Sequence, residues 1–400
     1  MSAIRHDLPI LIAGGGIAGL ALAIALARQG LRCRVLEARD SFSEAGAGIQ
    51  LGPNATRILA DLGVLDALTA QATRPQAINV SLARTGQRIA QLPLGKWLSD
   101  RQSAPYVVTH RADLQTSLLT IARTHPAAQL ETGFRISTTD DAGASVTVHS
   151  DDGRAVEGSV LIGADGLWST VRDLVVPDYA LDYAGATAAR TLIATEKVPR
   201  SIQNDAVTLW LAPDAHVVAY PVRAGRQFAV VVISREPEPR HGWGVEADGA
   251  VLAQRLVGCE PDLSALVRAG DDWRKWALYD PRPLPRWHAG RIGLIGDAAH
   301  PILPYLAQGG AMAIEDAWVL ARLLAHHLTE PSTAFHLFQT ARYDRLQRIQ
   351  TASRQNGQIY HLRGAPAAAR DLGMKLLPAQ LLLRRYDWLY GWRTEDSPIA

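Results

Sequence analysis

The chain has 400 residues, 48% hydrophobic and 20% charged, which excludes a wholly disordered or collagen-like protein. Its 41 basic and 39 acidic side chains leave a net charge of +2, so no nucleic-acid partner is expected on electrostatic grounds. At about 150 residues per domain, the length predicts roughly two or three domains. Cys33 and Cys259 are too few for a disulfide framework or a zinc site built on cysteine. We expect reduced, buried thiols, a cytoplasmic protein and no metal.

The apolar run from Leu8 to Ala27 raises the question of a membrane span or a cleaved leader. Successive glycines interrupt the run, and each glycine inside a helix costs about 1 kcal/mol. The run divides instead into a buried strand over 9–13 and a helix over 17–28, followed by a strand over 33–37. We therefore expect a βαβ unit and no integral membrane segment.

Three glycines in this unit have the spacing G-x-G-x-x-G, which is typical of a dinucleotide-binding turn. Gly14 permits the tight turn, Gly16 lets a pyrophosphate approach the backbone, and Gly19 lets the helix pack closely on the strand. The helix N-terminus offers free N–H groups and partial positive charge to the phosphates. Glu37 ends the second strand, where its carboxylate can accept hydrogen bonds from an adenosine ribose. The unit predicts binding of FAD or NAD rather than NADP; a tight turn without a ligand is the plainer alternative.

The rest of the chain alternates strand and helix patterns, joined by polar turns and by a charged loop over 236–243. The expected helices span 53–62, 111–124 and 250–257, and two more begin near 261 and 309. Asn54 is the expected cap of the helix over 53–62. The expected strands are a hairpin over 78–92 and the segments 105–108, 130–136, 144–148, 155–162, 207–211, 217–221, 228–233 and 292–295.

These elements predict an α/β fold in which a Rossmann-like dinucleotide-binding domain carries an inserted antiparallel-sheet domain and a helical C-terminal tail. The first domain is expected to be discontinuous, over 1–75, 103–180 and 285–340. The sheet domain, where a substrate would bind, takes 76–102 and 181–284, and the helical C-terminal region takes 341–400.

Two further motifs place an acid after a glycine directly behind a predicted buried strand. Gly163-Ala164-Asp165-Gly166 follows one such strand, and Gly296-Asp297 follows another. Each motif alone indicates no more than a strand followed by a turn. Because α/β sheets bind ligands at the carboxyl ends of their strands, both are candidate ligand contacts.

The strings GGGIAGL, GADGLWSTVR and GDAAHPILPYLAQGG together resemble the single-component FAD-dependent aromatic hydroxylases, the family typified by para-hydroxybenzoate hydroxylase. The resemblance covers about Pro9 to Leu328, with weaker support in the tail, and is greatest to the salicylate, 3-hydroxybenzoate and 6-hydroxynicotinate hydroxylase branch. It implies an enzyme that binds FAD and takes electrons from NADH or NADPH. Its substrate would be a small aromatic acid, hydroxylated with O2 through a flavin C4a-hydroperoxide. The resemblance leaves a monomer or a homodimer open.

The resemblance also implies cofactor roles for particular residues. Glu37 would hold the ADP half of FAD with the glycines of the first motif, Arg111 would lie along the flavin, and Asp297 would accept hydrogen bonds from the ribityl chain. Gly309 and Gly310 would start a helix whose N-terminus stabilises the negative charge of reduced flavin. The expected cofactor contacts are Gly14, Gly16, Ile17, Ala18, Gly19, Glu37, Ala38, Arg39, Gln50, Arg111, Gln115, Asp165, Gly166, Asp297, Pro304, Gly309, Gly310 and Ala311.

His216 and Tyr220 are the candidate catalytic residues on the inserted sheet. Their spacing of four puts both on one face of a strand, and histidine has the near-neutral pKa that suits a base. The resemblance supports this pair and adds Gln308 as a third candidate. The alternative is an ordinary pair on a sheet face that meets solvent. The expected substrate contacts are Tyr305, Arg190 and Arg223.

Arg342, Arg345 and Arg348 repeat every three residues in the basic tail. The simplest interpretation is a solvated helix face; a dimer contact or an attraction for acidic substrates are the alternatives.

Two other functions stay open at this point. One is a flavin monooxygenase, hydroxylase or epoxidase, of a larger tailoring substrate. The other is a flavin-binding sensor or scaffold without turnover.

Overall fold

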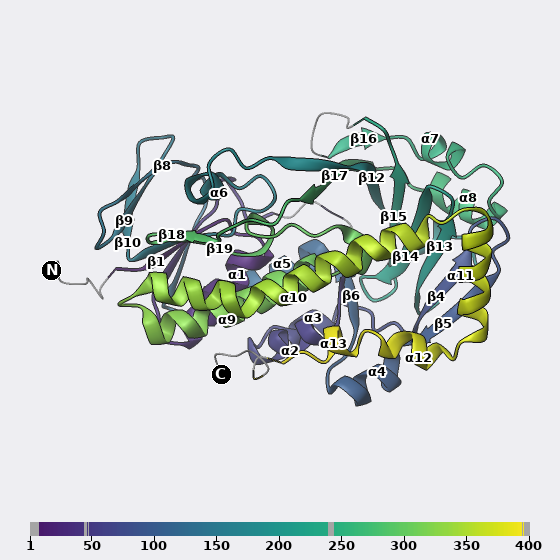
Figure 1. Cartoon of the computed structure of the whole chain (residues 1–400), viewed down its shortest axis with the longest axis horizontal. Coiled ribbons are helices and arrows are strands. Elements are labelled where there is room, and N and C mark those ends of the chain that lie inside the picture. The colour runs from purple at the N-terminus through teal and green to yellow at the C-terminus, as the bar shows by residue number, and fades with distance from the viewer. Residues whose placement is uncertain (1–7, 44–45, 47, 239–243, 394, 396–400) are drawn as a thin grey trace.

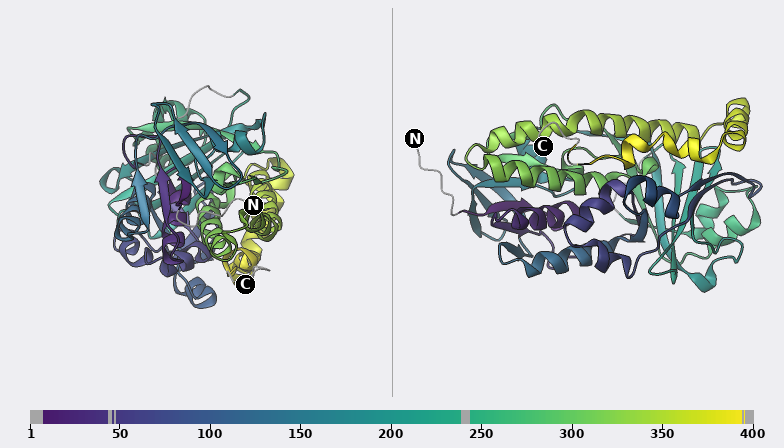
Figure 2. Two further views of the ribbon diagram at one scale, coloured as in Figure 1. Left: turned by 90° about the vertical axis from the view of Figure 1, so that its left-hand side faces the viewer. Right: turned by 90° about the horizontal axis from the view of Figure 1, so that it is seen from below.

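The computed structural model describes residues 8–43, 46, 48–238, 244–393 and 395. The molecule is elongated, with a parallel sheet near one end and a large, mostly antiparallel sheet at the other (Figure 1). Helix α10 (Pro331–Tyr360) runs between the two ends, and α9 (Gly309–His327) lies beside it, as the right view of Figure 2 shows. None of the helices within the described ranges is long and apolar enough to cross a membrane.

The parallel sheet confirms the Rossmann-like unit predicted from the first motif. Its strand order is β18-β19-β11-β1-β2-β7, and all pairings except β18–β19 are parallel. Helix α1 (Ile17–Arg28) connects β1 to β2 and is buried along most of its length, which explains its almost wholly apolar sequence. The strands are β1 (Ile10–Ala13), β2 (Cys33–Leu36), β7 (Ala128–Glu131), β11 (Val160–Gly163), β18 (His288–Ala289) and β19 (Ile292–Leu294).

The second sheet has eight strands in the order β16-β17-β12-β15-β14-β13-β4-β5. The prediction of a purely antiparallel sheet is wrong at one place, because β4 and β13 pair in parallel. These two strands come from separate parts of the chain, so no hairpin forces them to run in opposite directions. The strands are β4 (Ala77–Leu82), β5 (Arg88–Pro93), β12 (Leu181–Ala194), β13 (Ala206–Ala212), β14 (Ala215–Val222), β15 (Gln227–Arg235), β16 (Val245–Ala247) and β17 (Trp273–Pro281).

The two faces of this sheet have different neighbours. Helices α7 (Gly249–Gln254) and α8 (Pro261–Arg268) share an apolar core with one face, through residues such as Val217 and Val230. The opposite face, which carries Ile233, packs against Tyr305 in the short helix η3 (Pro304–Leu306). This second face borders the loop that continues the third glycine motif.

Two small sheets correct the predicted strands in the middle of the chain. The expected strand over 130–136 is not continuous, because β7 ends at Glu131 and Gly133, with φ of +68°, turns the chain before β8 (Ile136–Asp141) begins. The expected strand over 155–162 is two strands, β10 (Ala155–Gly158) in one sheet and β11 in another. The remaining strands are β9 (Val146–Ser150), β3 (Gly48–Leu51) and β6 (Val107–His110).

Most predicted helices are confirmed, but Asn54 is not a cap. Helix α2 (Pro53–Asp61) has Gly52 at its N-cap and proline at its first position, so the side chain of Asn54 points into the protein and is fully buried. Most of the predicted loop 236–243 lies outside the described residues. The other helices are α3 (Leu65–Thr69), α4 (Gly95–Gln102), α5 (Arg111–Thr124), α6 (Thr170–Val175), η1 (Thr195–Lys197), η2 (Gly296–Ala298), α11 (Gly364–Leu376), α12 (Ala379–Arg384) and α13 (Asp387–Tyr390).

The arginines of the tail do not form a solvated face. Arg342 is fully buried, the side chain of Arg345 is 9% exposed, and only Arg348 is exposed, over the ring of Trp388 at 3.9 Å. The guanidinium groups of Arg342 and Arg345 both lie about 5 Å from the ring of Trp392. The tail therefore folds back onto α10 and covers these cations. Both cysteines are free, Cys33 buried and Cys259 half-buried, so only the first matches the expected burial.

Candidate active site

The three glycine motifs meet at one edge of the parallel sheet. Strand β1 pairs with β11, and β11 pairs with β19, so their carboxyl ends lie side by side. A Cβ added at Gly14 would lie 2.7 Å from the carbonyl oxygen of Ala164, and one added at Gly296 would lie 3.3 Å from the Cβ of Ala18. The loops that follow the three strands therefore form one continuous rim, as their common position behind buried strands predicts.

The first loop has the form of a phosphate cradle. Gly14 has φ of +100°, and a Cβ at Gly19 would lie only 1.9 Å from the carbonyl oxygen of Gly14. The N-cap of α1, Gly16, has no side chain that could bond the first N–H groups of the helix. Backbone shape and unsatisfied donors at this helix N-terminus fit the pyrophosphate of a dinucleotide.

Glu37 closes the cradle at the end of β2. Its carboxylate accepts hydrogen bonds from the N–H of Gly15 at 2.8 Å and of Arg39 at 3.0 Å. Gln115 of α5 donates to the carbonyl oxygen of Gly15 at 2.9 Å. Glu37 and Gln115 thus orient the glycine loop itself. That Glu37 also holds an adenosine ribose stays a prediction.

The two other predicted acids have different surroundings. Asp165 accepts hydrogen bonds from the N–H groups of Thr170 and Val171, at 2.9 and 3.2 Å, so it fixes the start of α6. Burial raises the pKa of Asp165, against the lowering effect of these hydrogen bonds. Asp297 is half-buried in η2, and a Cβ added at Gly309 would lie 3.9 Å from Asp297 Oδ1. Of the two carboxylates, Asp297 is the one directed at the start of α9.

The start of α9 is shaped to receive a flat, anionic group. Its first residues are Gly309 and Gly310, and no side chain caps the helix. A Cβ at Gly310 would lie 2.6 Å from Ile49 Cδ1, so the space there is narrow. Gln308, which is 1% exposed, accepts a hydrogen bond at 3.1 Å from the Nδ2 of Asn54. The helix N-terminus and these small residues fit the predicted flavin contact.

A buried ion cluster lies one to two turns into α9, formed by Glu315, Asp316, His300, Arg342 and Arg345. Arg342 donates to Glu315 at 2.7 Å and to Asp316 at 2.8 Å, and Arg345 donates to both oxygens of Glu315. Burial alone would raise the pKa of Asp316, but the charges of His300 and Arg342 overcome it and lower the pKa to about 2. The cluster fixes α9 against α10 and so fixes the position of the glycines at its start.

His216 and Tyr220 do not face solvent, so that alternative is wrong. Each is 2% exposed, and both lie on the face of β14 toward the third motif. The ring of Tyr305 lies 5.6 Å from that of His216, centroid to centroid. His216 Nδ1 lies 2.9 Å from His361 Nε2. Burial and then the neighbouring His361 lower the pKa of His216 well below its usual value.

Tyr220 joins the sheet face to the predicted flavin contacts. Its side chain forms a hydrogen bond with Gln50, and a Cβ added at Gly48 would lie 2.5 Å from Tyr220 Oη. Gln50 in turn accepts a hydrogen bond at 2.8 Å from Tyr106. Burial raises the pKa of Tyr220, although the charge of Arg190 lowers it in part. Tyr220 is therefore a neutral phenol at pH 7.

The structure brings Arg190 to this face but not Arg223. On β12, Arg190 is the register partner of Val231 of β15, and Val231 is the partner of Val218 of β14. Val218 lies between His216 and Tyr220, so Arg190 is on the same face as these two residues. Its guanidinium stacks at 5.4 Å on the ring of Trp276. Arg223 follows the far end of β14, seven residues and therefore roughly 23 Å from His216. There its guanidinium lies 3.6 Å from the carboxylate of Asp113.

Two residues of this site had no local signal in the sequence. His361 directly follows α10, a helix of 30 residues, and belongs to no recognisable sequence motif. It lies near His216 because α10 is long enough to extend to the second sheet. Asn54 looks like a helix cap, but its Nδ2 donates to both Gln308 and Glu315. Of the remaining predicted cofactor residues, Ile17 and Ala18 lie in the first turn of α1, Ala38 follows Glu37, Pro304 begins η3 and Ala311 lies in the first turn of α9. Arg111 begins α5, with its Cδ 3.4 Å from a Cβ added at Gly46.

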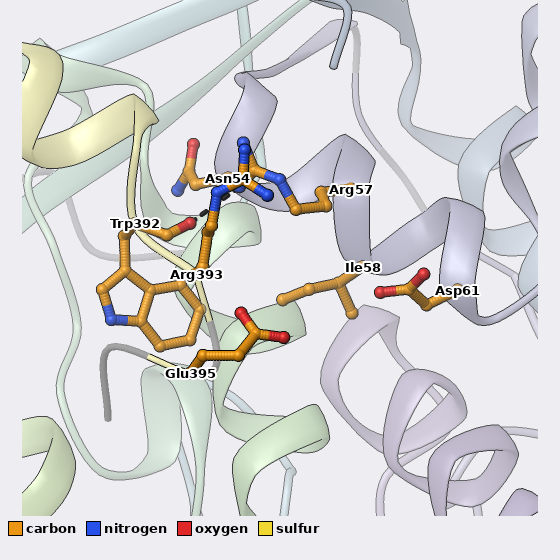
Figure 3. Close-up of a pocket in the computed structure, with 7 residues that line it drawn as sticks. All are labelled: Asn54, Arg57, Ile58, Asp61, Trp392, Arg393 and Glu395. Atoms are coloured by element: carbon orange, nitrogen blue, oxygen red, sulfur yellow. Dashed lines mark hydrogen bonds between the residues drawn. The ribbon is translucent and has the colours of Figure 1, made fainter. Parts of the chain in front are cut away.

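A separate cavity of about 260 Å³ is lined by residues of α2 and of the C-terminal tail (Figure 3). Arg57 donates to the carbonyl oxygen of Trp392 at 2.7 Å, and Asp61 and Glu395 lie at the other side. His216 and Tyr220 are not among the residues that line this cavity. Asn54 lines it and also donates a hydrogen bond to Gln308.

Comparisons with known proteins agree with this geometry. A family model described as "FAD binding domain" matches residues 7–356. The chain is 38% identical over 389 residues to a 3-hydroxybenzoate 6-hydroxylase of Polaromonas naphthalenivorans (strain CJ2), covering 96% of each chain. It is 37% identical over 397 residues to the 3-amino-4-hydroxybenzoate 2-monooxygenase PtnB3 of Streptomyces platensis, covering 99% and 98%. The solved structure of Klebsiella pneumoniae HpxO complexed with FAD and uric acid superposes with a TM-score of 0.85, at 25% identity and full coverage of both chains.

Proposed function

Because the chain belongs to the FAD-binding-domain family, in its group of single-component aromatic hydroxylases, we propose that it hydroxylates a small aromatic or N-heteroaromatic hydroxy acid. NADH or NADPH and O2 are the other substrates in this proposal, and the enzyme works in the cytoplasm. The observation that carries the proposal is the position of His216. Its ring lies 5.6 Å from that of Tyr305, which stands in the chain between the predicted flavin contacts Pro304 and Gly309.

FAD fits the rim formed by the three motifs. The first motif and Glu37 would hold the ADP half, and Asp297 with the start of α9 would hold the ribityl chain and the ring. Bound FAD would accept hydride from the reduced nicotinamide and supply the means to transfer one atom of O2 to the substrate ring. Gly309 and Gly310 would keep bare N–H groups against the edge of the ring that becomes negative on reduction.

In this proposal His216 removes the proton from the substrate hydroxyl. Its lowered pKa keeps the ring neutral at pH 7, so one nitrogen carries a lone pair that can accept the proton. An ionised hydroxyl makes the aromatic ring richer in electrons and hence a better nucleophile. Tyr220, a neutral phenol held by Gln50, would donate a hydrogen bond to the same oxygen.

Gln308 and Arg190 would position the substrate. Asn54 donates to the carbonyl oxygen of the Gln308 side chain, so the amide NH2 points away from Asn54 and can donate elsewhere. Arg190 stacks on Trp276 beside this face, and a guanidinium binds a carboxylate with two parallel hydrogen bonds. A hydroxyl near His216 and a carboxylate near Arg190 describe a small aromatic hydroxy acid.

The test is a screen of the FAD-loaded protein with NADH and with NADPH. The ligands are 3-hydroxybenzoate, 3-amino-4-hydroxybenzoate, salicylate and 6-hydroxynicotinate; the measurements are O2 uptake and product identification. We expect at least one acid to accelerate oxidation of the nicotinamide and to yield a hydroxylated product. If oxidation stays slow with every acid, the proposal is overturned, and a monooxygenase of a larger tailoring substrate and a flavin-binding sensor or scaffold become the alternatives to test.

A further inference from the structure

His216 and His361 form a hydrogen-bonded pair in the interior of the protein. His216 Nδ1 lies 2.9 Å from His361 Nε2, and the two residues are 2% and 6% exposed. A contact of this length requires one ring to donate an N–H and the other to offer a lone pair, so the two tautomers are complementary. The second nitrogen of each ring points away from the pair. His216 Nε2 is therefore the nitrogen that remains for the substrate.

The pair extends from the face of β14 where the proposed substrate would bind to the end of β15 near Arg235. On the inner side, the rings of Tyr305 and Tyr360 lie 5.6 and 5.3 Å from that of His216. On the outer side, Arg235 at the end of β15 and Arg370 of α11 carry the charges that act on His361. Next to them, Arg363 forms an ion pair with the half-exposed Asp214 in the turn between β13 and β14. His361 thus lies directly beneath polar surface.

Both rings are neutral at pH 7. Burial, with the charges of Arg235 and Arg370, lowers the pKa of His361 to about 4, and the pKa of His216 is also well below its usual value. A neutral His216 can accept a proton, but a buried imidazolium without a carboxylate partner is unfavourable. A phenol with a pKa near 10 does not give up its proton to such a base unless the proton moves on.

We propose that His361 is a positioning residue that relays this proton to the surface. The substrate O–H bond breaks and an N–H bond forms at His216 Nε2. At the same time the proton on His216 Nδ1 moves to His361 Nε2, and the proton on His361 Nδ1 leaves to water. One proton enters and one leaves, no electrons are transferred, and both rings are neutral before and after. When the product hydroxyl is protonated again, the same steps run backward and restore the tautomers.

This inference rests on the proposed function, because the relay requires a substrate hydroxyl. The test compares His361→Gln with His336→Gln, which makes the same change at an exposed position of α10. The amide of glutamine can hold a hydrogen bond to His216 but cannot pass a proton on. FAD content, melting temperature, KM and kcat are measured, together with proton release to an indicator dye when 3-hydroxybenzoate binds to the anaerobic enzyme.

We expect His361→Gln to lower kcat about 100-fold and to abolish proton release, with FAD content and KM unchanged. His336→Gln should behave as wild type. In His361→Ala, added imidazole should restore kcat, which a merely structural role would not allow. Wild-type kcat and proton release in His361→Gln, or absence of imidazole rescue in His361→Ala, overturn the relay alone. A wild-type enzyme that hydroxylates none of the acids overturns the proposed function and the relay together.

Discussion

Arg342 and Asp316 are both fully buried, and Arg342 Nε donates a hydrogen bond of 2.8 Å to Asp316 Oδ1. Through this contact the middle of α10 holds the second turn of α9, which begins at Gly309. Glu315 beside it accepts from Arg342 and Arg345. The buried carboxylates of Asp316 and Glu315 are therefore neutralised by Arg342 and Arg345, which belong to the next helix along the chain.

Replacement of Arg342 by methionine should destabilise the protein by about 3–5 kcal/mol, because it leaves buried carboxylates without their principal partner. Urea unfolding with saturating FAD measures the change. Arg348→Met is the matched control, because Arg348 is exposed and its stacking on Trp388 is worth about 1 kcal/mol or less. Equal, small losses in both variants would show that the cluster contributes no more than a surface contact.

Gly19→Ala should yield protein with little or no FAD. The added Cβ would lie 1.9 Å from the carbonyl oxygen of Gly14, so the loop must open. The measurement is flavin absorbance per protein after purification. Gly373→Ala is the control, since that helical glycine has open space around it and a negative φ. A full complement of FAD in Gly19→Ala would disprove our assignment of the cradle.

Asp297→Ala should weaken FAD binding about tenfold or more, because it removes a carboxylate that would accept hydrogen bonds from the ribityl chain. Titration of apoprotein with FAD, followed by quenching of flavin fluorescence, gives the dissociation constant. Asp100→Ala serves as control, since Asp100 is exposed and forms an ion pair with Lys96 in the same helix. Unchanged affinity in Asp297→Ala would remove this residue from the cofactor site.

His216→Gln should retain FAD and still oxidise NADH or NADPH, while product formation falls about 10²- to 10⁴-fold. The loss is expected in the proton step and not in cofactor binding, since His216 lies on β14 of the second sheet and not in the loops of the three glycine motifs. The ratio of product formed to nicotinamide oxidised is the measurement. Turnover that stays coupled in this variant would contradict the role of His216 as base.

The stability of the protein should fall as the pH drops from about 6.5 to about 4. The folded pKa of His361, about 4, lies below its unfolded value, so the unfolded chain binds more protons in this range. Asp316, with a folded pKa of about 2, loses its contribution only below this range. Urea unfolding at several pH values should show a shallower decline in His361→Gln. The same slope in both proteins would mean that His361 is not buried as a neutral ring.

The sequence predicted the parallel sheet and the loops behind its strands well, because each of those features has a local pattern. Gly14, Gly16 and Gly19 stand within six residues, and a buried strand precedes each motif. Strand β14 was predictable too, with His216 and Tyr220 on one face. That this face is buried was not, because the alternation of residues does not say what covers a sheet.

Contacts between distant segments were beyond prediction. Spacing showed that Arg342 and Arg345 share a helix face, but their burial depends on Glu315 and on the returning tail at Trp392. His361 lies 145 residues from His216 and joins it only because α10 is long enough to reach the second sheet. In each case the deciding fact is a tertiary distance and not a local propensity.

The strand order of the parallel sheet also bears on synthesis of the protein. Strand β19 pairs with β11 but follows it by more than a hundred residues. At a synthesis rate of 5–20 residues per second, β19 leaves the ribosome about 6–26 s after β11. During that time the edge of β11 exposes unpaired N–H and carbonyl groups, the kind of edge that aggregates. The nascent chain therefore needs protection from other chains until residues 292–294 emerge.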